Sequence, residues 1–258
     1  MLISEIISVI EKKAPLRYAY SWDNSGFLCG DINRDVKRVY LTLDVNRYTV
    51  EEAASAGAEL IISHHPIMFG GIKKINYGTN EGFIISELIK NDMALYASHT
   101  PMDTACGGLN DVLAQKLGIT DTDIIERHVP GEECGLGRIG KLEKPVTLKE
   151  FAESVKKALN TPFVRVMGDM DRNIKCAAVG SGACSDIIHA AHAMGADVMV
   201  TADMKYHIAM DSEESGICVI DAGHYPTEVF VIDIFEKLLE DTQLDIIKST
   251  EKDVFAVL

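Results

Sequence analysis

The sequence has few cysteines and no excess of positive charge, and each shortage excludes a class of protein. Six cysteines are scattered along 258 residues, and no two of them form a CxxC pair. Structural zinc of the ribbon or finger type is therefore not expected, and the thiols fit a reducing cytoplasm, where they stay free. The formal net charge is -14 at pH 7, whereas nucleic-acid binding needs a basic face, so no nucleic-acid partner is expected.

Long apolar runs are also absent. No run reaches the roughly 18 apolar residues needed to span a bilayer, so no membrane partner is expected. The first residues, MLISEIISVIEKKAP, begin like a short signal segment, but Glu5 and Glu11 interrupt it and no small-residue cleavage site follows. We interpret this segment as an amphipathic first helix that ends at Pro15. A cytoplasmic protein is the expectation.

Short apolar runs alternate with helical patterns through most of the chain. The run RVYLTLDV (38–45) predicts a strand, and AELIIS (58–63) predicts a buried strand. Between them, a capping box at Thr49 and Glu52 begins a predicted helix that ends at Gly57. This order is typical of an α/β fold, with mixed sheets covered by helices.

The alternation stops between residues 121 and 146, where the sequence is rich in glycine and charge. It resumes at a second capping box, formed by Thr147 and Glu150. We therefore expect two lobes. The first covers residues 1–125 and is completed by the C-terminal segment 226–258, and the second covers residues 126–225.

The two lobes are expected to be related by an internal repeat. The segment AASAGAELIISHH (53–65) matches AHAMGADVMVTAD (191–203) in its order of helix end, glycine, apolar strand and polar pair. A His-x-Pro-x-acid motif then follows a strand in each half, at 99–103 and at 224–228. These matches predict two α/β lobes related by a pseudo-twofold axis. Because α/β sheets bind ligands at the carboxyl ends of their strands, we expect a metal site in the crevice between the lobes.

The residues at these strand ends are histidines and carboxylates. Neighbouring residues within a strand point to opposite faces, but at the end of the strand 58–63 both rings of an adjacent pair can turn to one place. Imidazole and carboxylate without thiolate are ligands for Zn, Mn, Fe, Co or Ni. Their number exceeds the four that one tetrahedral zinc needs, which predicts two bridged divalent ions. The candidates are His64, His65, His99, Asp103, Asp203, His207, His224 and Glu228.

The carboxylates differ in reach. Asp103 is short and would fix one ion, whereas Glu228 has an extra methylene and could span two. Each lies in the first turn of a predicted helix, where the dipole favours an anion. Asp203 and His207 have an alternative role, in which an outer carboxylate orients a ligand imidazole. The other three histidines are interpreted as surface or packing residues: His128, His189 and His192.

Two further stretches are candidates for substrate binding. The turn VGSGACSD (179–186) could hold a phosphate on the N–H groups of Gly180, Ser181 and Gly182, but it lacks the Lys-Ser/Thr of a P-loop, and a simple tight turn is the alternative. The stretch SWDNSGFLCG (21–30) contains the only tryptophan. Its residues Trp22, Asp23 and Asn24 are either a pocket wall or a loop anchored by a buried ring.

Five segments together resemble one known family. They are SWDNSGFLCG, SHHPIMFGGIKKI, SHTPMDTACGGLND, TADMKYH and DAGHYPTE, in order from residue 21 to residue 228. The chain is similar to the GTP cyclohydrolase I type 2 homologs, also called Ngg-interacting-factor-three-like proteins. It resembles the compact form of this family, because the stretch around 121–146 is too short to hold the inserted middle domain of longer members.

The resemblance implies a two-lobed α/β fold, a toroidal homohexamer and a dinuclear divalent-metal site. Carried onto this sequence, the implied ligands are His64, His65, Asp103, His224 and Glu228, and His99 becomes a residue outside the ligand set. The family label further implies opening of the guanine imidazole ring of GTP by a metal-activated water, with His99 or Asp203 moving protons.

Two hypotheses for function follow. The first is a dinuclear metal-dependent hydrolase acting on a nucleotide or a related phosphorylated heterocycle, nominally GTP. The second is a metal-binding regulatory hexamer that acts through protein partners and has no enzymatic activity. An open coordination position favours the enzyme, because five ligands are too few to saturate two ions.

Overall fold

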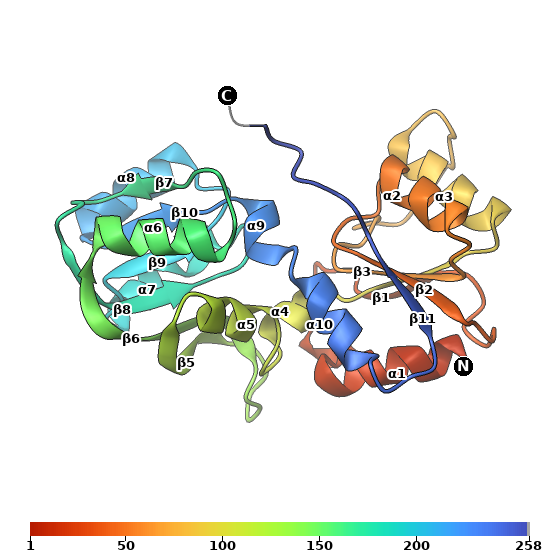
Figure 1. Ribbon diagram of the computed structural model, residues 1–258, viewed down its shortest axis with the longest axis horizontal. Helices are drawn as coiled ribbons and strands as arrows, with labels where there is room; N and C mark the ends of the chain where they lie inside the picture. Colours follow the sequence, from red (N-terminus) through yellow and green to blue (C-terminus); the bar gives the residue numbers. More distant parts are fainter. Residues whose placement is uncertain (257–258) are drawn as a thin grey trace. The chain divides into compact units, whose positions relative to one another are not determined.

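The structure is a computed structural model and describes residues 1–256 (Figure 1). The chain forms two compact units. The first consists of Met1–Met102 and Val231–Lys252, and the second of Asp103–Phe230 with residues 253–256. Within residues 1–256, no helix is both long and apolar enough to cross a membrane.

The first unit is built on a five-stranded mixed sheet. Its strand order is β1-β4-β3-β2-β11, in which β1 is antiparallel to β4 and the other neighbours are parallel. The elements of this unit are α1 (Ile3–Lys13), η1 (Leu16–Tyr18), β1 (Gly26–Cys29), β2 (Arg38–Thr42), α2 (Arg47–Ser55), β3 (Leu60–Ser63), α3 (Asn80–Lys90), β4 (Ala94–Ala97), α10 (Val231–Leu238) and β11 (Asp245–Lys248).

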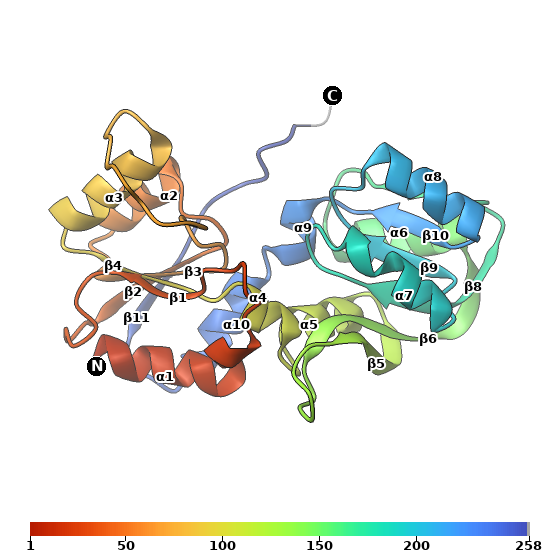
Figure 2. The same ribbon diagram turned by 180° about the vertical axis from the view of Figure 1, so that it is seen from behind.

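Helices cover both faces of this first sheet (Figures 1 and 2). On one face, α2 and α3 pack through Val50, Ile84 and Leu88 against Tyr40 and Ile61 of the sheet. On the opposite face lie α1 and α10, and the predicted amphipathic helix at the N-terminus is confirmed as α1, which ends at Lys13, just before Pro15. Because both faces are covered, β3 is buried at every position, as its continuous apolar run predicts.

The second unit contains a six-stranded mixed sheet of order β5-β6-β8-β9-β10-β7. Helices α7 and α8 cover one face of it, and α5 and α6 cover the other (Figures 1 and 2). Its elements are α5 (Leu109–Lys116), β5 (Ile119–Arg127), β6 (Gly135–Thr147), α6 (Leu148–Ala158), β7 (Arg165–Met167), β8 (Asn173–Val179), η2 (Ser185–Ile187), α7 (Ile188–Ala193), β9 (Val198–Thr201), α8 (Tyr206–Ser215), β10 (Cys218–Asp221) and α9 (His224–Glu228).

The predicted repeat is visible in the strand order of the two sheets. In the first sheet, β1-β4-β3-β2 runs antiparallel, parallel, parallel from neighbour to neighbour. In the second sheet, β7-β10-β9-β8 has the same sequence of directions. The matched motifs therefore follow equivalent strands, since His64 comes after β3 and Ala202 after β9, whereas His99 follows β4 and His224 follows β10.

The limits of the units differ from the predicted lobes. The first unit ends at Met102, within α4 (Thr100–Thr104), and the predicted boundary at 125/126 lies inside β5 of the second unit. Residues 121–146, interpreted as a break, are largely a hairpin of β5 and β6, and β6 pairs onward with β8. This hairpin extends the second sheet beyond the repeated part, and it lies wholly within the second unit.

Candidate functional site

The adjacent histidines lie where β3 ends in the first unit. The pairing of β2 with β3 continues past Ser63, because the N–H groups of His64 and His65 donate to the carbonyl oxygens of Thr42 and Leu43. Their ring centroids are 5.0 Å apart and the ring planes are tilted by 46°. Both rings therefore occupy the same end of the sheet.

Each of these two rings is oriented by an oxygen acceptor. The Nδ1 atom of His64 lies 2.9 Å from the carbonyl oxygen of Ser98, and Nδ1 of His65 lies 2.8 Å from Oδ1 of Asp44. Because these acceptors carry no hydrogen, Nδ1 must be the protonated nitrogen, and Nε2 carries the lone pair. Metal-binding histidines typically use this arrangement, since the bond at Nδ1 fixes the tautomer and the ring orientation.

His99 joins this pair in the first unit. Its ring centroid lies 5.3 Å from that of His64 and 5.3 Å from that of His65. One ring nitrogen from each of the three histidines lies within 4.8 Å of the others, a spacing that a single metal ion could bridge. The first unit therefore contains a cluster of three imidazoles that could hold a metal.

Asp23 orients His99 and is itself enclosed by hydrogen bonds. Its Oδ1 lies 2.9 Å from Nδ1 of His99, and its Oδ2 accepts hydrogen bonds from the hydroxyl groups of Thr100 and Ser25. Burial raises the pKa of Asp23, but the bonds from His99, Thr100 and Ser25 outweigh it and hold the pKa well below its usual range. Asp23 is therefore a carboxylate that keeps Nδ1 of His99 protonated.

The positions of Trp22 and Asn24, on either side of Asp23, distinguish between the two interpretations of this stretch. Trp22 is 57% exposed, so the alternative of a loop anchored by a buried ring is wrong. Its ring stacks on Tyr20 at 6.0 Å and lies 5.7 Å from the ring of His99. Asn24 donates to the carbonyl oxygen of Met68 at 2.6 Å. The loop is held by Asp23 and Asn24, and the indole is left as an exposed aromatic face.

The second unit carries a separate set of donors on α9. His224 and Glu228 lie one turn apart, with Nε2 of His224 2.9 Å from Oε2 of Glu228. The Nδ1 atom of His224 lies 2.7 Å from Oδ2 of Asp203, which follows β9 and has a φ of 52°. If Nδ1 keeps its proton toward Asp203, the lone pair of Nε2 faces a carboxylate, an arrangement that a cation between them would stabilise.

Asp103 belongs to the second unit, where it is buried. The hydroxyl of Ser181 donates to its carboxylate at 3.3 Å, and Asn110 donates to its backbone carbonyl oxygen at 3.0 Å. The thiol of Cys184 is buried nearby, and burial raises its pKa well above the usual range, an effect that the negative charges of Asp103 and Glu228 reinforce. This cysteine therefore stays a thiol, and the donors of this unit remain imidazole and carboxylate.

The glycine-rich turn uses its N–H groups within the protein. The N–H of Gly180 donates to the carbonyl oxygen of Val200 at 2.9 Å, and that of Ser181 to Oδ1 of Asn110 at 2.9 Å. The N–H of Gly182 donates to the hydroxyl of Thr227 at 3.1 Å. These bonds favour the tight-turn alternative over phosphate binding, because a phosphate would have to displace all three acceptors.

Gly182 lies directly against the donors of α9. Its φ is 57°, and a Cβ at this position would lie 2.1 Å from Oε1 of Glu228 and 3.2 Å from Cε1 of His224. A contact of 2.1 Å is far below van der Waals distance. Only glycine therefore fits here while Glu228 keeps its position.

His207 is placed differently from the other candidates. It is exposed on α8, where its ring lies 5.6 Å from that of Tyr206. Asp203 orients His224 instead, and in the described part of the chain no hydrogen bond links it to His207. Sequence reasoning missed Asp44 and Asn110. Asp44 could have been found, since it follows the strand 38–42 as the other candidates follow theirs.

The comparison with known proteins assigns the chain to a family. The sequence profile described as Duf34/NIF3 (NGG1p interacting factor 3) matches residues 1–254. The chain belongs to the DUF34/NIF3 family. Within it, the chain is 36% identical to the "GTP cyclohydrolase 1 type 2 homolog" of Clostridium perfringens, over 99% of each chain. It is 35% identical to the homolog of Streptococcus pneumoniae, over 90% of this chain and 88% of the relative.

Solved structures of the DUF34/NIF3 family share the fold. A Bacillus cereus protein related to NIF3 superposes with a TM-score of 0.92 at 27% identity, covering 100% of this chain and 99% of that one. Reduced HcgD from Methanocaldococcus jannaschii superposes with a TM-score of 0.84 at 31% identity, covering 97% of this chain and 98% of that one. The two mixed sheets covered by helices are therefore the architecture of the family.

Proposed function

We propose that the chain is a hydrolase that requires two divalent metal ions and acts on a nucleotide-like substrate. One observation carries the proposal. Four histidines each have an oxygen acceptor at Nδ1, namely Ser98 for His64, Asp44 for His65, Asp23 for His99 and Asp203 for His224. Structural histidines have no need for this repeated arrangement, whereas a metal site needs Nε2 as a lone-pair donor in a fixed direction.

The proposed ligands are the five that the family resemblance implies. His64 and His65 come from the first unit, and Asp103, His224 and Glu228 come from the second. The donor set fits a divalent ion of the Zn, Mn, Fe, Co or Ni series, because it consists of imidazoles and carboxylates with no thiolate. When bound, such ions would lower the pKa of water and polarise the group under attack.

His99 is proposed to move the proton. The carboxylate of Asp23 holds its Nδ1 proton, so Nε2 is the nitrogen that can accept a proton from water or return one to a leaving group. Its half-buried ring is fixed by this bond. Asp203 serves His224 in the same manner as Asp23 serves His99, and we propose an orienting role for it.

The substrate class rests on the relatives and on one exposed ring. The curated relatives carry the name GTP cyclohydrolase 1 type 2 homolog, which supports a nucleotide such as GTP. Trp22 offers an exposed indole 5.7 Å from the ring of His99, and bases stack well on such faces. We propose that the base of the substrate stacks on Trp22.

The proposed enzyme is a cytoplasmic homohexamer. The six cysteines are all free in the structure, as a reducing compartment would leave them. The hexamer follows from the family resemblance, and light scattering of the purified protein tests it. We expect six times the chain mass of 28.3 kDa, and a monomer would contradict the assembly.

Metal content and GTP turnover measured on the same preparation test the proposed function. The protein is purified without chelator and reloaded with Mn, Zn or Fe. We expect GTP loss that depends on metal and is abolished in Glu228→Ala but unchanged in Glu214→Ala, an exposed glutamate on α8. If the wild type binds metal but does not consume GTP under any of these loadings, the proposed substrate is wrong.

A further inference from the structure

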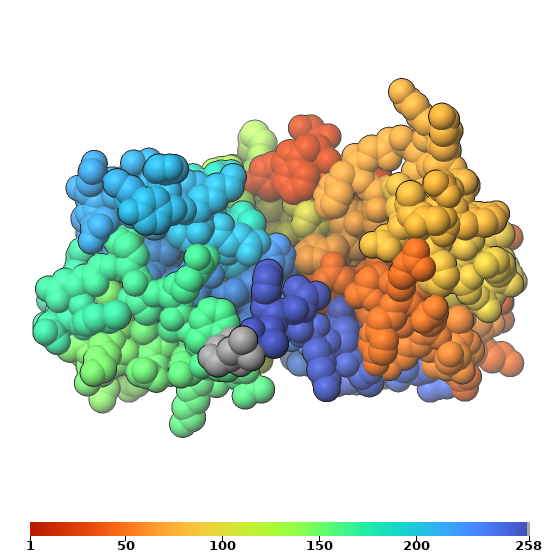
Figure 3. Space-filling model, turned by 90° about the horizontal axis from the view of Figure 1, so that it is seen from above, coloured from red at the N-terminus to blue at the C-terminus, as the bar shows by residue number. Residues whose placement is uncertain are grey.

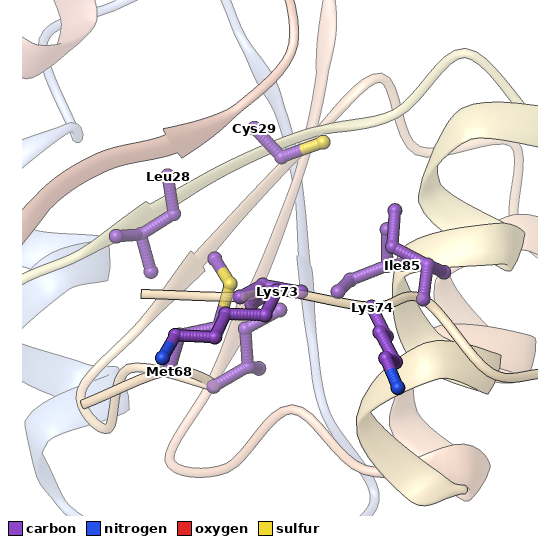
Figure 4. A pocket seen from close by; sticks show the side chains of 9 residues that line it. Leu28, Cys29, Met68, Lys73, Lys74 and Ile85 are labelled. Atoms are coloured by element: carbon purple, nitrogen blue, oxygen red, sulfur yellow. The ribbon is translucent and has the colours of Figure 1, made fainter. Parts of the chain in front are cut away.

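We propose that the first unit carries a second binding site, for a small organic anion with an apolar body. A cavity of about 370 Å³ opens between β1, the segment after His65 and α3. Leu28, Ile67, Ile72 and Ile85 contribute apolar walls, and Lys73 and Lys74 lie at its rim (Figure 4). This volume is at the small end of the range of known ligand sites, which is roughly 300–1,000 Å³.

The charge of the rim identifies the class of ligand. No acidic side chain lines the cavity, and within residues 1–256 neither lysine forms an ion pair. By contrast, Lys90 pairs with Glu87, and Lys248 pairs with Asp233 and Glu236. Two adjacent lysines at the rim of an apolar cavity complement an anion, and of the lysine pairs in this chain only this one lines that cavity.

The walls identify the rest of the ligand. Ile85 is buried and Leu28, Ile67 and Ile72 are half-buried, so an apolar body in the cavity would remove their remaining surface from water. The thiol of Cys29 also lines the cavity, and burial raises its pKa, so it adds no negative charge. The expected ligand is an aromatic or branched aliphatic molecule with one carboxylate, sulfonate or phosphate group.

This cavity is distinct from the proposed metal ligands. None of its lining residues is a histidine or an acid. The segment that carries Lys73 and Lys74 is exposed at the surface of the first unit, and its yellow-orange atoms are visible in Figure 3. Met68 lines the cavity, and its carbonyl oxygen accepts the hydrogen bond from Asn24. The ring centroid of the next residue, Phe69, lies 6.0 Å from that of His99. A ligand in the cavity would therefore contact the segment that borders His99.

Titration with a fluorescent probe tests this site without metal or nucleotide. The anionic probe is 8-anilinonaphthalene-1-sulfonate, and the neutral one is N-phenyl-1-naphthylamine, which has the same rings without the sulfonate. We expect one saturable site per chain for the anionic probe. The double variant Lys73→Gln/Lys74→Gln should raise its Kd roughly tenfold and leave that of the neutral probe unchanged. The matched control is Lys12→Gln/Lys13→Gln, a lysine pair at the end of α1 that should change neither Kd.

A second variant tests the apolar walls. Ile72→Trp changes a half-buried residue in a surface segment, so the fold is expected to survive, and the added ring volume should weaken binding of both probes. Equal affinity of the anionic probe for the wild type and the double lysine variant would overturn the proposal. So would unchanged binding of both probes in Ile72→Trp, since the probes would then bind elsewhere. Neither result depends on whether the chain hydrolyses GTP.

Discussion

Hydrogen bonds to carboxylates fix three imidazoles of the candidate site, those of His65, His99 and His224, whereas a backbone carbonyl fixes His64. Asp23 is the most enclosed of these carboxylates, because it accepts bonds from His99, Thr100 and Ser25 and its side chain has no exposed surface. A buried charge is tolerated only when hydrogen bonds replace its hydration. The bonds that keep Asp23 ionised are therefore the same bonds that hold the ring of His99.

Replacing Asp23 by asparagine should destabilise the fold in a pH-dependent way. The folded pKa of Asp23 is lowered, so its stabilising contribution is complete above the unfolded pKa of about 3.9 and is lost as pH falls through the folded pKa. Asp23→Asn should thus reduce the free energy of unfolding by about 2 kcal/mol at pH 7, and by less below about pH 4. Urea denaturation at pH 7, 5 and 3.5 measures it. An equal loss at every pH would contradict the assigned charge.

Gly182 should control how Glu228 is placed. An alanine there would push against Oε1 of Glu228, so Gly182→Ala should reduce bound metal from about two ions per chain to about one. The control is Gly118→Ala, since Gly118 has a φ of 71° but nothing within 4 Å of a built Cβ. Both variants place an alanine at a positive φ, which L-residues rarely adopt. Elemental analysis of dialysed protein measures the metal, and full loading of Gly182→Ala would show that Glu228 is not confined.

Some of these residues can be predicted from sequence, and others cannot. The strand-end histidines and acids are predictable, because a short apolar run followed by a polar pair is a local pattern. Their partners come from distant segments, as Asp23 lies 76 residues before His99 and Asn110 lies 71 residues before Ser181. The clash at Gly182 also depends on packing against α9 and has no sequence signal beyond the glycine itself.

At the scale of elements, the last strand of the chain, β11, completes the first sheet and brings Glu251 to the carboxyl end of β2. β11 adds in parallel to β2, and the residues after it return to the carboxyl end of β2. There the carboxylate of Glu251 accepts bonds from the hydroxyl of Thr42 at 2.6 Å and the N–H of Leu43 at 2.7 Å. Burial raises the pKa of Glu251, and the bonds from Thr42 and Leu43 partly offset this. Asp44, which follows Leu43 in the chain, is the residue that orients His65.

Removing this carboxylate should affect both stability and metal binding. Glu251→Ala leaves the Leu43 N–H without its acceptor in a buried site, and should lower the free energy of unfolding by about 2 kcal/mol. It should also weaken metal binding, because Glu251 no longer holds the segment that contains Asp44, and Asp44 orients the proposed ligand His65. Glu251→Gln keeps one oxygen acceptor and should recover most of both. Urea denaturation and titration with Mn²⁺ measure the two effects, and wild-type values for Glu251→Ala would contradict this role.

The elements show why the alternating pattern was predictable and the hairpin was not. β3 and β9 are short and buried throughout, so their apolar runs are continuous. β5 and β6 include exposed positions and many charged residues, because antiparallel strands can face water on one side and then need to be apolar only in part. The same composition is typical of a loop, so the sequence alone does not distinguish the two.

At the scale of the whole molecule, the proposed metal ligands are divided between the two units. His64 and His65 lie in the unit of Met1–Met102, and His224 and Glu228 lie in the unit that begins at Asp103. The two sets occupy equivalent places in the internal repeat, since His64 follows β3 as Ala202 follows β9, and His99 follows β4 as His224 follows β10. The family match extends over residues 1–254 and therefore covers both units.

Manganese counting combined with electron paramagnetic resonance tests this claim most directly. The protein is stripped of metal, reloaded with Mn²⁺ and dialysed, and the bound ions are counted for the wild type and His65→Ala. We predict about two ions per wild-type chain with the spectrum of an exchange-coupled pair, and fewer ions without coupling in His65→Ala, whose circular dichroism stays unchanged. A wild-type chain that holds no manganese, or holds it only as isolated ions, would contradict the account.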